Sequence, residues 1–144
     1  MGKVSIVYWS GTGNTEAMAA AIAEGAKDAG AEVELLTVDK AEAAAISEAK
    51  AFALGCPAMG AEELEEGEME PFMAELDSQI AGKTIALFGS YGWGGGEWMR
   101  DWESRIAADG AAVLSGEGII ADNAPDDDVL AECRAAGAKL AALV

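Results

Sequence analysis

The stretch that decides the fold is Val4-Ser5-Ile6-Val7-Tyr8-Trp9-Ser10-Gly11-Thr12-Gly13-Asn14-Thr15. Its first half is an apolar run typical of a buried strand, and its second half brings hydroxyl and amide side chains with two glycines. Glycines let backbone N–H groups close around an anion, and the positive end of a following helix points at that anion. Because this loop contains no Lys or Arg, it predicts a phosphate site built from neutral donors.

Working outward from this loop, short apolar runs alternate with longer Ala-rich segments at helical spacing. Strands are expected at 3–9, 32–38, 51–55 and 84–89, with a fifth over 111–121 that is interrupted by Gly116 and Gly118. Helices are expected at 14–28, 39–49 (with Asp39 and Glu42 as a capping box), 71–80, 97–108 and from Pro125 onward. This alternation predicts an α/β fold, a single-domain three-layer α-β-α sandwich with a five-stranded parallel sheet over residues 1–144.

The charge and the residue composition of the chain exclude several kinds of binding partner and catalytic site. The 144 residues carry 9 basic and 26 acidic side chains, a net charge of −17, which argues against nucleic acid and anionic membranes. The acids cluster at 62–70 and 126–128, which leaves open either a basic protein partner or a merely solvated surface. Histidine is absent, which excludes His-based triads and imidazole zinc sites.

The sequence also indicates where the protein is located and whether its two cysteines are reduced. No apolar window approaches the ~20 residues of a membrane span, and the N-terminal residues do not have the pattern of an export signal. We therefore expect a cytoplasmic protein. Cys56 and Cys133 show no metal-ligand spacing, and two reduced, partly buried thiols are expected.

Three loops follow the expected strand ends, where ligands of doubly wound sheets bind. They are 10–15, 56–62 and 90–96, of which the second offers Met59 and a glycine turn and the third pairs Tyr91 and Trp93 with glycines. Taken singly, these features can be a helix cap, a core aromatic and an ordinary turn. Together they favour a pocket for a planar ring that carries a phosphorylated tail.

Other nucleotide motifs fit poorly. No Lys follows the first loop as a P-loop requires, and Glu16 stands where a GxGxxG fingerprint needs its third glycine. The acidic phosphoacceptor cluster of a receiver domain is missing from the expected strand ends.

Three motifs resemble a known family. Tyr-Trp-Ser-Gly-Thr-Gly-Asn-Thr at 8–15, Gly-Cys-Pro-Ala-Met-Gly at 55–60 and Leu-Phe-Gly-Ser-Tyr-Gly-Trp-Gly at 87–94 look like the short-chain flavodoxins of anaerobic bacteria. The resemblance covers essentially the whole chain. It implies strand order 2-1-3-4-5 and one non-covalent FMN.

The resemblance also implies the residues that contact FMN, with none acting as a catalytic residue or a metal ligand. The phosphate would be bound by Ser10, Gly11, Thr12, Gly13, Asn14 and Thr15. Met59 and Trp93 would enclose the ring, with Gly60, Ala61 and Glu62 along its N5 and N3 edge and Pro57 and Ala58 just before them. Ser90, Tyr91, Gly92 and Gly94 would line the opposite side, with Asn123 near the ribityl chain or ring edge.

The function implied is that of a low-potential one-electron carrier, not an enzyme, cycling mainly between the semiquinone and hydroquinone of FMN. The acidic chain and the absence of cations from the three loops would disfavour the negative charge of the hydroquinone. At the Met59–Glu62 turn, Ala61 is expected to favour the conformation in which the Gly60 carbonyl accepts the flavin N5–H. Basic redox proteins, such as flavin reductases and ferredoxin-linked oxidoreductases, would be its partners, and we expect a monomer.

The alternative is a small FMN-dependent quinone or nitro reductase on the same fold. Such enzymes are usually longer and carry a substrate pocket, whereas 144 residues leave little beyond five β-α units. The length therefore favours the carrier.

Overall fold

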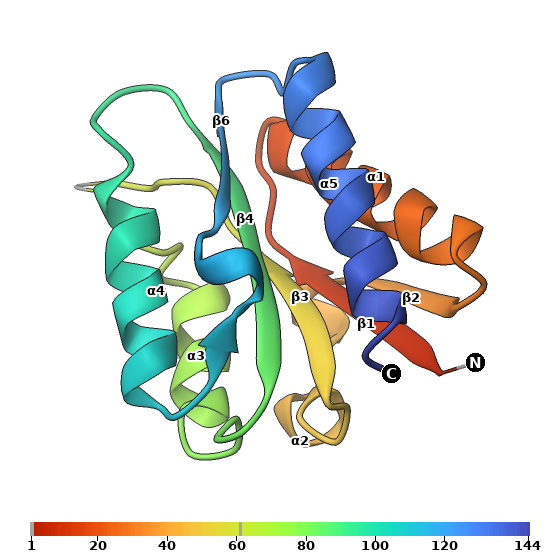
Figure 1. Cartoon of the computed structure of the whole chain (residues 1–144). Helices are drawn as coiled ribbons and strands as arrows, with labels where there is room; N and C mark the ends of the chain where they lie inside the picture. The colour runs from red at the N-terminus through yellow and green to blue at the C-terminus, as the bar shows by residue number, and fades with distance from the viewer. Residues whose placement is uncertain (1, 61) are drawn as a thin grey trace.

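The protein was analysed as a computed structural model, which describes residues 2–60 and 62–144 (Figure 1). The strands are β1 (Lys3–Tyr8), β2 (Glu32–Thr37), β3 (Ala51–Gly55), β4 (Thr84–Tyr91), β5 (Ala112–Val113) and β6 (Ile119–Asp122). The helices are α1 (Asn14–Asp28), α2 (Ala43–Ile46), α3 (Met69–Leu76), α4 (Glu97–Ala108) and α5 (Asp127–Ala141), with 3-10 turns η1 (Val38–Lys40) and η2 (Leu114–Gly116). All strand pairs of the sheet are parallel, in the order β2-β1-β3-β4-β5, which confirms the expected fold class and strand order.

The fifth strand is interrupted as the sequence predicts. Ile85 pairs with Val113 in β5, and the pairing with β4 resumes at Phe88 opposite Ile119 in β6. Between the two halves the chain makes the η2 turn, where Ser115 has a φ of 61°. β5 and β6 are therefore two halves of one edge strand, separated by a short excursion of the backbone.

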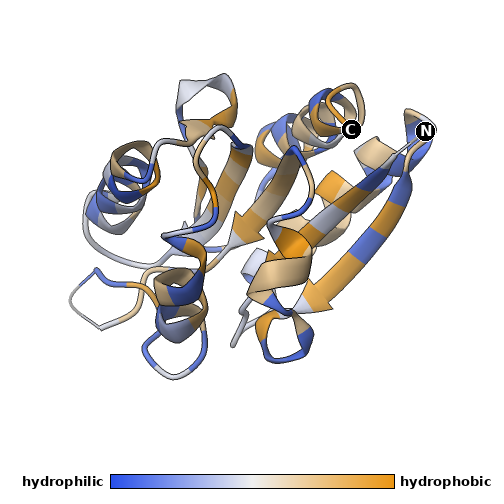
Figure 2. Ribbon diagram, turned by 90° about the horizontal axis from the view of Figure 1, so that it is seen from below, coloured by the Kyte–Doolittle hydropathy of each residue, from blue (hydrophilic) through white to orange (hydrophobic). Residues whose placement is uncertain are grey.

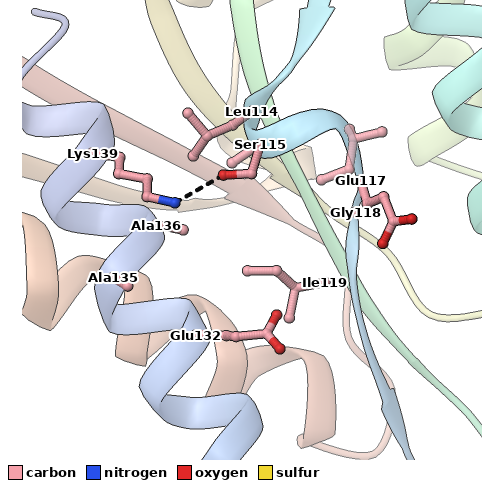
Figure 3. A pocket seen from close by; sticks show the side chains of 11 residues that line it. Leu114, Ser115, Glu117, Gly118, Ile119, Glu132, Ala135, Ala136 and Lys139 are labelled. Carbon is pink, nitrogen blue, oxygen red and sulfur yellow. Dashed lines mark hydrogen bonds between the residues drawn. The ribbon is translucent and has the colours of Figure 1, made fainter.

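A pocket of about 280 Å³ lies beside this excursion, between it and α5. Figure 3 shows the Lys139 ammonium reaching across from α5 to donate a hydrogen bond to Ser115 Oγ at 3.0 Å, with the Glu132 carboxylate on the same helix. None of the described residues that line this pocket belongs to the loops 10–15, 56–62 or 90–96. It is a consequence of the broken edge strand rather than part of the predicted ligand site.

Helices cover both faces of the sheet. In Figure 1, α1 and α5 lie on one face, while α3 and α4 lie on the other. The core accordingly divides in two: alternate strand residues such as Ile6 and Phe88 pack with α1 and α5, and their neighbours such as Val7 and Leu87 pack with α3 and α4. Figure 2 shows the strands of the sheet mainly in hydrophobic colours, as expected for a sheet whose two faces are both covered by helices.

The two long helices on the first face approach each other very closely. A Cβ placed on Gly25 of α1 would lie 1.9 Å from the Arg134 carbonyl oxygen, and one on Gly137 of α5 would lie 2.0 Å from the Ile22 carbonyl oxygen. The two glycines therefore let the backbones of α1 and α5 touch. This contact fixes α1, whose N-terminus follows the first loop.

Several boundaries differ from the expectation. The helix expected over 39–49 is wrong: Ala41 has extended backbone (φ −95°, ψ 144°), which separates η1 from a four-residue α2. The capping box is also wrong, because the residue before α2 is Glu42 and makes no side-chain cap hydrogen bond.

Other elements shift by a few residues. α3 begins at Met69, so Pro71 lies inside its first turn, and α5 begins after Asp126, which accepts a hydrogen bond from the Val129 N–H at 2.9 Å. β4 extends to Tyr91, which makes Ser90 and Tyr91 strand residues rather than loop residues. Both cysteines are free, as expected, but they are fully buried rather than partly buried. Within the described residues, no helix is both long and apolar enough to span a membrane.

Candidate functional site

A cleft of about 260 Å³ opens at the carboxyl ends of the central strands. Because parallel strands end at the same edge of the sheet, the loops after β1, β3 and β4 meet there. The described residues that line the cleft are Trp9, Gly11, Thr12, Asn14, Pro57, Ala58, Met59, Ser90, Tyr91, Gly92 and Asn123. None of these carries a charged side chain, although the chain as a whole has a net charge of −17.

The first loop supplies the polar donors of the cleft. Thr12 and Asn14 line it directly. Gly13 precedes α1 with a φ of 95°, a left-handed conformation that suits glycine. Ser10 shapes the loop from within, because its Oγ accepts hydrogen bonds from the backbone N–H groups of Gly13 at 3.1 Å and Glu16 at 3.3 Å. The loop thus brings hydroxyl and amide groups to the positive end of a long helix.

Thr15 connects the first loop to β4. Its side chain is buried, and its Oγ1 lies 3.4 Å from both Ser90 Oγ and the Ser90 backbone N. Ser90 lines the cleft. Thr15 therefore lies behind the cleft and holds two of its walls together.

The second loop is closed by a pair of backbone hydrogen bonds. The Met59 N–H donates to the Glu63 carbonyl at 2.9 Å, and the Glu63 N–H donates to the Met59 carbonyl at 2.8 Å. Met59 lines the cleft, and together with Gly60, which has a φ of 51°, it also borders a second hollow. Ala61 lies outside the described residues, so the expected preference of this turn stays a prediction.

Glu62 reaches the third loop rather than the cleft lining. Its Oε1 accepts hydrogen bonds from the backbone N–H groups of Gly96 and Glu97, both at 3.1 Å, at the start of α4. Such a carboxylate satisfies amides that a helix N-terminus leaves free and lies at the positive end of its dipole. Gly94 packs so closely that a Cβ there would lie 2.5 Å from the Glu62 carboxyl carbon. Glu62 thus ties the second loop to the third.

The end of β4 and the third loop that follows it contribute residues both inside and outside the cleft. Tyr91 and Gly92 line it, and the Tyr91 ring lies against Trp98, with ring centroids 5.7 Å apart. Trp93 is 66% exposed and does not belong to the lining. Asn123 closes this side, because its N–H donates to the Tyr91 carbonyl at 2.7 Å.

Trp9 is the cleft residue that the sequence reasoning missed. Its ring lies next to Gly11, where an added Cβ would be 3.2 Å from the ring, and its indole N–H donates to Glu68 Oε1 at 3.2 Å. The available signal was its position, since Trp9 is the last residue of the apolar run before Ser10. The sequence pattern places Trp9 in the strand expected at 3–9 and gives no separate sign of a role in the cleft.

Two ionisable groups near the cleft are held in their neutral forms. Burial raises the pKa of the Cys56 thiol to about 12, and burial followed by the nearby Glu16 carboxylate raises the pKa of Tyr8. Neither group supplies a nucleophile or a base at neutral pH. The Cys56 thiol and the Tyr8 phenol are therefore both uncharged at neutral pH.

The donor set fits FMN. Hydroxyl, amide and helix N-terminal N–H groups can hold a phosphate monoester, while Trp9, Met59 and Tyr91 provide apolar and aromatic surface beside it. A doubly wound α/β fold with such a cleft at its strand ends defines a nucleotide-binding protein of the flavin-carrying class.

Comparison with known proteins identifies the family. The flavodoxin family model matches residues 6–137. The chain is 48% identical to the flavodoxin of Megasphaera elsdenii over 92% of this chain and 98% of that one, and 48% identical to the flavodoxin of Clostridium beijerinckii over 86% and 89%. The solution structure of two-electron reduced Megasphaera elsdenii flavodoxin superposes with a TM-score of 0.86 at 47% identity, over 94% of this chain and 98% of that one.

The chain belongs to the flavodoxin family. As a flavodoxin it is an FMN-binding electron-transfer protein and not an enzyme. Its relatives of known sequence include the short flavodoxins of anaerobic bacteria, as the motifs predicted.

Proposed function

We propose that this flavodoxin is a low-potential carrier that moves one electron at a time, working mainly between the two more reduced states of its FMN. The observation that carries the proposal is the uncharged cleft within a strongly acidic chain. Bound FMN would supply the redox chemistry, and the second reduction, to the hydroquinone, tends to place a negative charge on the ring. With no cation in the lining and a net charge of −17, the protein opposes that added charge, which lowers the potential.

The residues proposed to bind FMN have separate roles. Thr12 and Asn14, with the N-terminal amides of α1, would hold the phosphate, and the buried pair Thr15 and Ser90 would fix the distance between phosphate and ring sites. Their neighbours Ser10, Gly11 and Gly13 would shape the same loop. This division is supported by the contacts of Thr15 with Ser90, which join the first loop to β4.

The ring would lie between the second and third loops. Met59 would cover one side, with Pro57, Ala58 and Gly60 around it, while Tyr91 and Gly92 lie opposite, next to Asn123. Trp93 would cover the outer side of the ring, losing its present exposure on binding, with Gly94 and Glu62 holding its loop. Ala61, outside the described residues, is proposed as part of the same turn.

Basic redox proteins are the proposed partners, among them flavin reductases and ferredoxin-linked oxidoreductases. The support is the charge of the loop beside the cleft, where Glu63, Glu66 and Glu68 are all exposed. Opposite charge steers such encounters and speeds association at low salt. We further propose that the protein works in the cytoplasm as a monomer of one domain over residues 1–144.

Stepwise anaerobic reduction of the FMN-loaded protein, followed by its visible spectrum, tests the proposal. A long-wavelength intermediate at half reduction, followed by a second step at a much lower potential, is the expected result. Entry of both electrons at one mild potential would refute it. Rapid oxidation of a nicotinamide cofactor in the presence of a quinone would instead favour a reductase.

A further inference from the structure

Glu65 is a buried acidic residue at the end of the second loop. Its side chain belongs to a residue only 9% exposed, between the exposed residues Glu63 and Glu66. Burial of a carboxylate is costly unless hydrogen bonds compensate for the lost water. The Glu65 carboxylate is therefore expected to accept hydrogen bonds from nearby groups of the protein.

The carboxylate gathers the backbone amides at the start of α3. Oε1 accepts from the N–H groups of Gly67 and Glu68, and Oε2 accepts from those of Glu68 at 2.9 Å and Met69 at 3.2 Å. These are amides that the first turn of a helix leaves without an internal partner. Glu65 thus fixes where the loop ends and α3 begins.

The backbone of Glu65 ties the same point to the beginning of the loop. Its N–H lies 3.4 Å from the sulfur of Cys56, the residue that follows β3. Cys56 is held in turn by the indole N–H of Trp98, which donates to the Cys56 carbonyl at 3.0 Å. Both ends of the segment 56–65 therefore meet at Glu65 and are anchored to α3 and α4.

The middle of this segment has ties of its own. The Ala58 N–H donates to the Ser90 carbonyl at 3.0 Å, and Glu62 Oε1 accepts from two backbone N–H groups at the start of α4, both at 3.1 Å. Met59 also borders a second hollow of about 370 Å³, which Glu65 lines as well. The position of Met59 therefore depends on its mutual hydrogen bonds with Glu63, on these ties and on the anchored ends of the segment.

We propose that Glu65 is a positioning residue for the flavin site: its carboxylate braces the segment 56–65 and thereby sets the position of Met59 and Glu62. The inference rests on the proposed function of Met59 and Glu62 at the ring. A role confined to the stability of α3 would leave the turn and the flavin unaffected when the carboxylate is lost.

The test compares Glu65→Gln with Glu66→Gln. Both substitutions remove one negative charge from the same loop, but Glu66 is exposed and makes no hydrogen bond among those of the described residues. Gln at 65 keeps one acceptor oxygen and turns an amide donor toward backbone N–H groups.

The first readout needs no FMN. In the apoprotein, Glu65→Gln is expected to speed amide hydrogen exchange of Met59 and Glu63 at least tenfold, with the amides of β3 and β4 unchanged. Glu66→Gln should change all of them less than twofold. Unchanged exchange of Met59 and Glu63 in Glu65→Gln would overturn the proposal, and so would equal effects of the two variants.

The second readout is the bound flavin. The Kd for FMN, measured by quenching of FMN fluorescence, should rise at least fivefold in Glu65→Gln and less than twofold in Glu66→Gln. The reduction potentials of the two variants should also differ. Equal potentials would contradict the proposal, because the loss of one negative charge would then account for the whole change. If the wild-type protein failed to bind FMN, the proposed function would be refuted while the exchange experiment still decided the role of Glu65.

A third variant covers the case in which Glu65→Gln does not fold. Glu65→Asp keeps the carboxylate but shortens its reach by one methylene. It is expected to speed the exchange of Met59 and Glu63 at least threefold, and a rate equal to that of the wild type would overturn the proposal.

Discussion

Replacing Gly137 by Ala tests the close contact between α1 and α5. The new Cβ would lie 2.0 Å from the Ile22 carbonyl oxygen and 2.7 Å from the Ala26 nitrogen, both backbone atoms of α1. Ordinary contact begins at 3.4 Å, so the helices must separate locally by about 1.4 Å. Backbone atoms cannot move aside as a flexible side chain can, which places the substitution at the upper end of overpacking costs.

The expected net effect follows from two opposing contributions. Overpacking of a close-packed contact costs up to about 3 kcal/mol, while Ala is favoured over Gly within a helix by about 1 kcal/mol. We therefore expect Gly137→Ala to lower the free energy of unfolding by about 2 kcal/mol. For a chain of this size that corresponds to a fall in Tm of roughly 4–8 °C.

Urea unfolding of the apoprotein, followed by tryptophan fluorescence and far-ultraviolet circular dichroism, measures this change. Ala138→Gly is the matched control, because Ala138 is exposed on the same helix and its substitution changes helix propensity alone. The control should lose about 1 kcal/mol. If Gly137→Ala is as stable as the wild type or more stable, the propensity gain prevails and the close contact inferred here is refuted.

Three further predictions concern single side chains. Glu62→Gln removes a charged acceptor from two amides at the start of α4 and should cost about 1 kcal/mol in urea unfolding; no loss of stability would contradict the cap. Burial raises the pKa of both Cys56 and Cys133 to about 12. Both thiols should therefore react with a thiol reagent at pH 8 only as fast as the protein unfolds. Rapid reaction in the native state would contradict their burial. Burial, and then the neighbouring carboxyl of Asp77, raise the pKa of Asp109 to about 6, above its value in the unfolded chain. The contribution of Asp109 to stability should therefore rise as the pH falls through 6 toward 4, so that Asp109→Asn, compared with the wild type by urea unfolding, should stabilise the protein at pH 7 but give no gain near pH 4.

Long, strongly patterned elements were predictable from sequence. The bounds expected for α1 and α4 are those observed, because both combine apolar residues at helical spacing with a clear N-terminal loop. The segment 39–49 was not predictable in this way. Its Ala residues and acids favour a helix, but the extended backbone at Ala41 and packing of Val38 and Ile46 against the sheet limit α2 to four residues.

Some features of the candidate site were predictable from the sequence, and others were not. The structure brings Thr12, Asn14 and Met59 to one cleft, as their places after predicted strand ends indicated, while their contacts with FMN stay predictions. The contacts of Glu62 and Glu65 were not, because each depends on amides of a helix that begins only after the loop has folded. Trp9 was missed because an apolar residue at the end of a strand is predicted to belong to the hydrophobic core.

By itself, the sequence determined the order of strands and helices along the chain, the uncharged loop of glycine, hydroxyl and amide residues after β1 and the acidity of the chain, because these depend on local patterning and composition. Only the tertiary structure decided that the cleft lining is free of charge, that Glu62 joins two loops and that Glu65 braces one of them. These features arise where the parallel strands end together and segments distant in sequence compete for the same backbone amides. Which carboxylate meets which amide is set by that three-dimensional arrangement and by no local pattern.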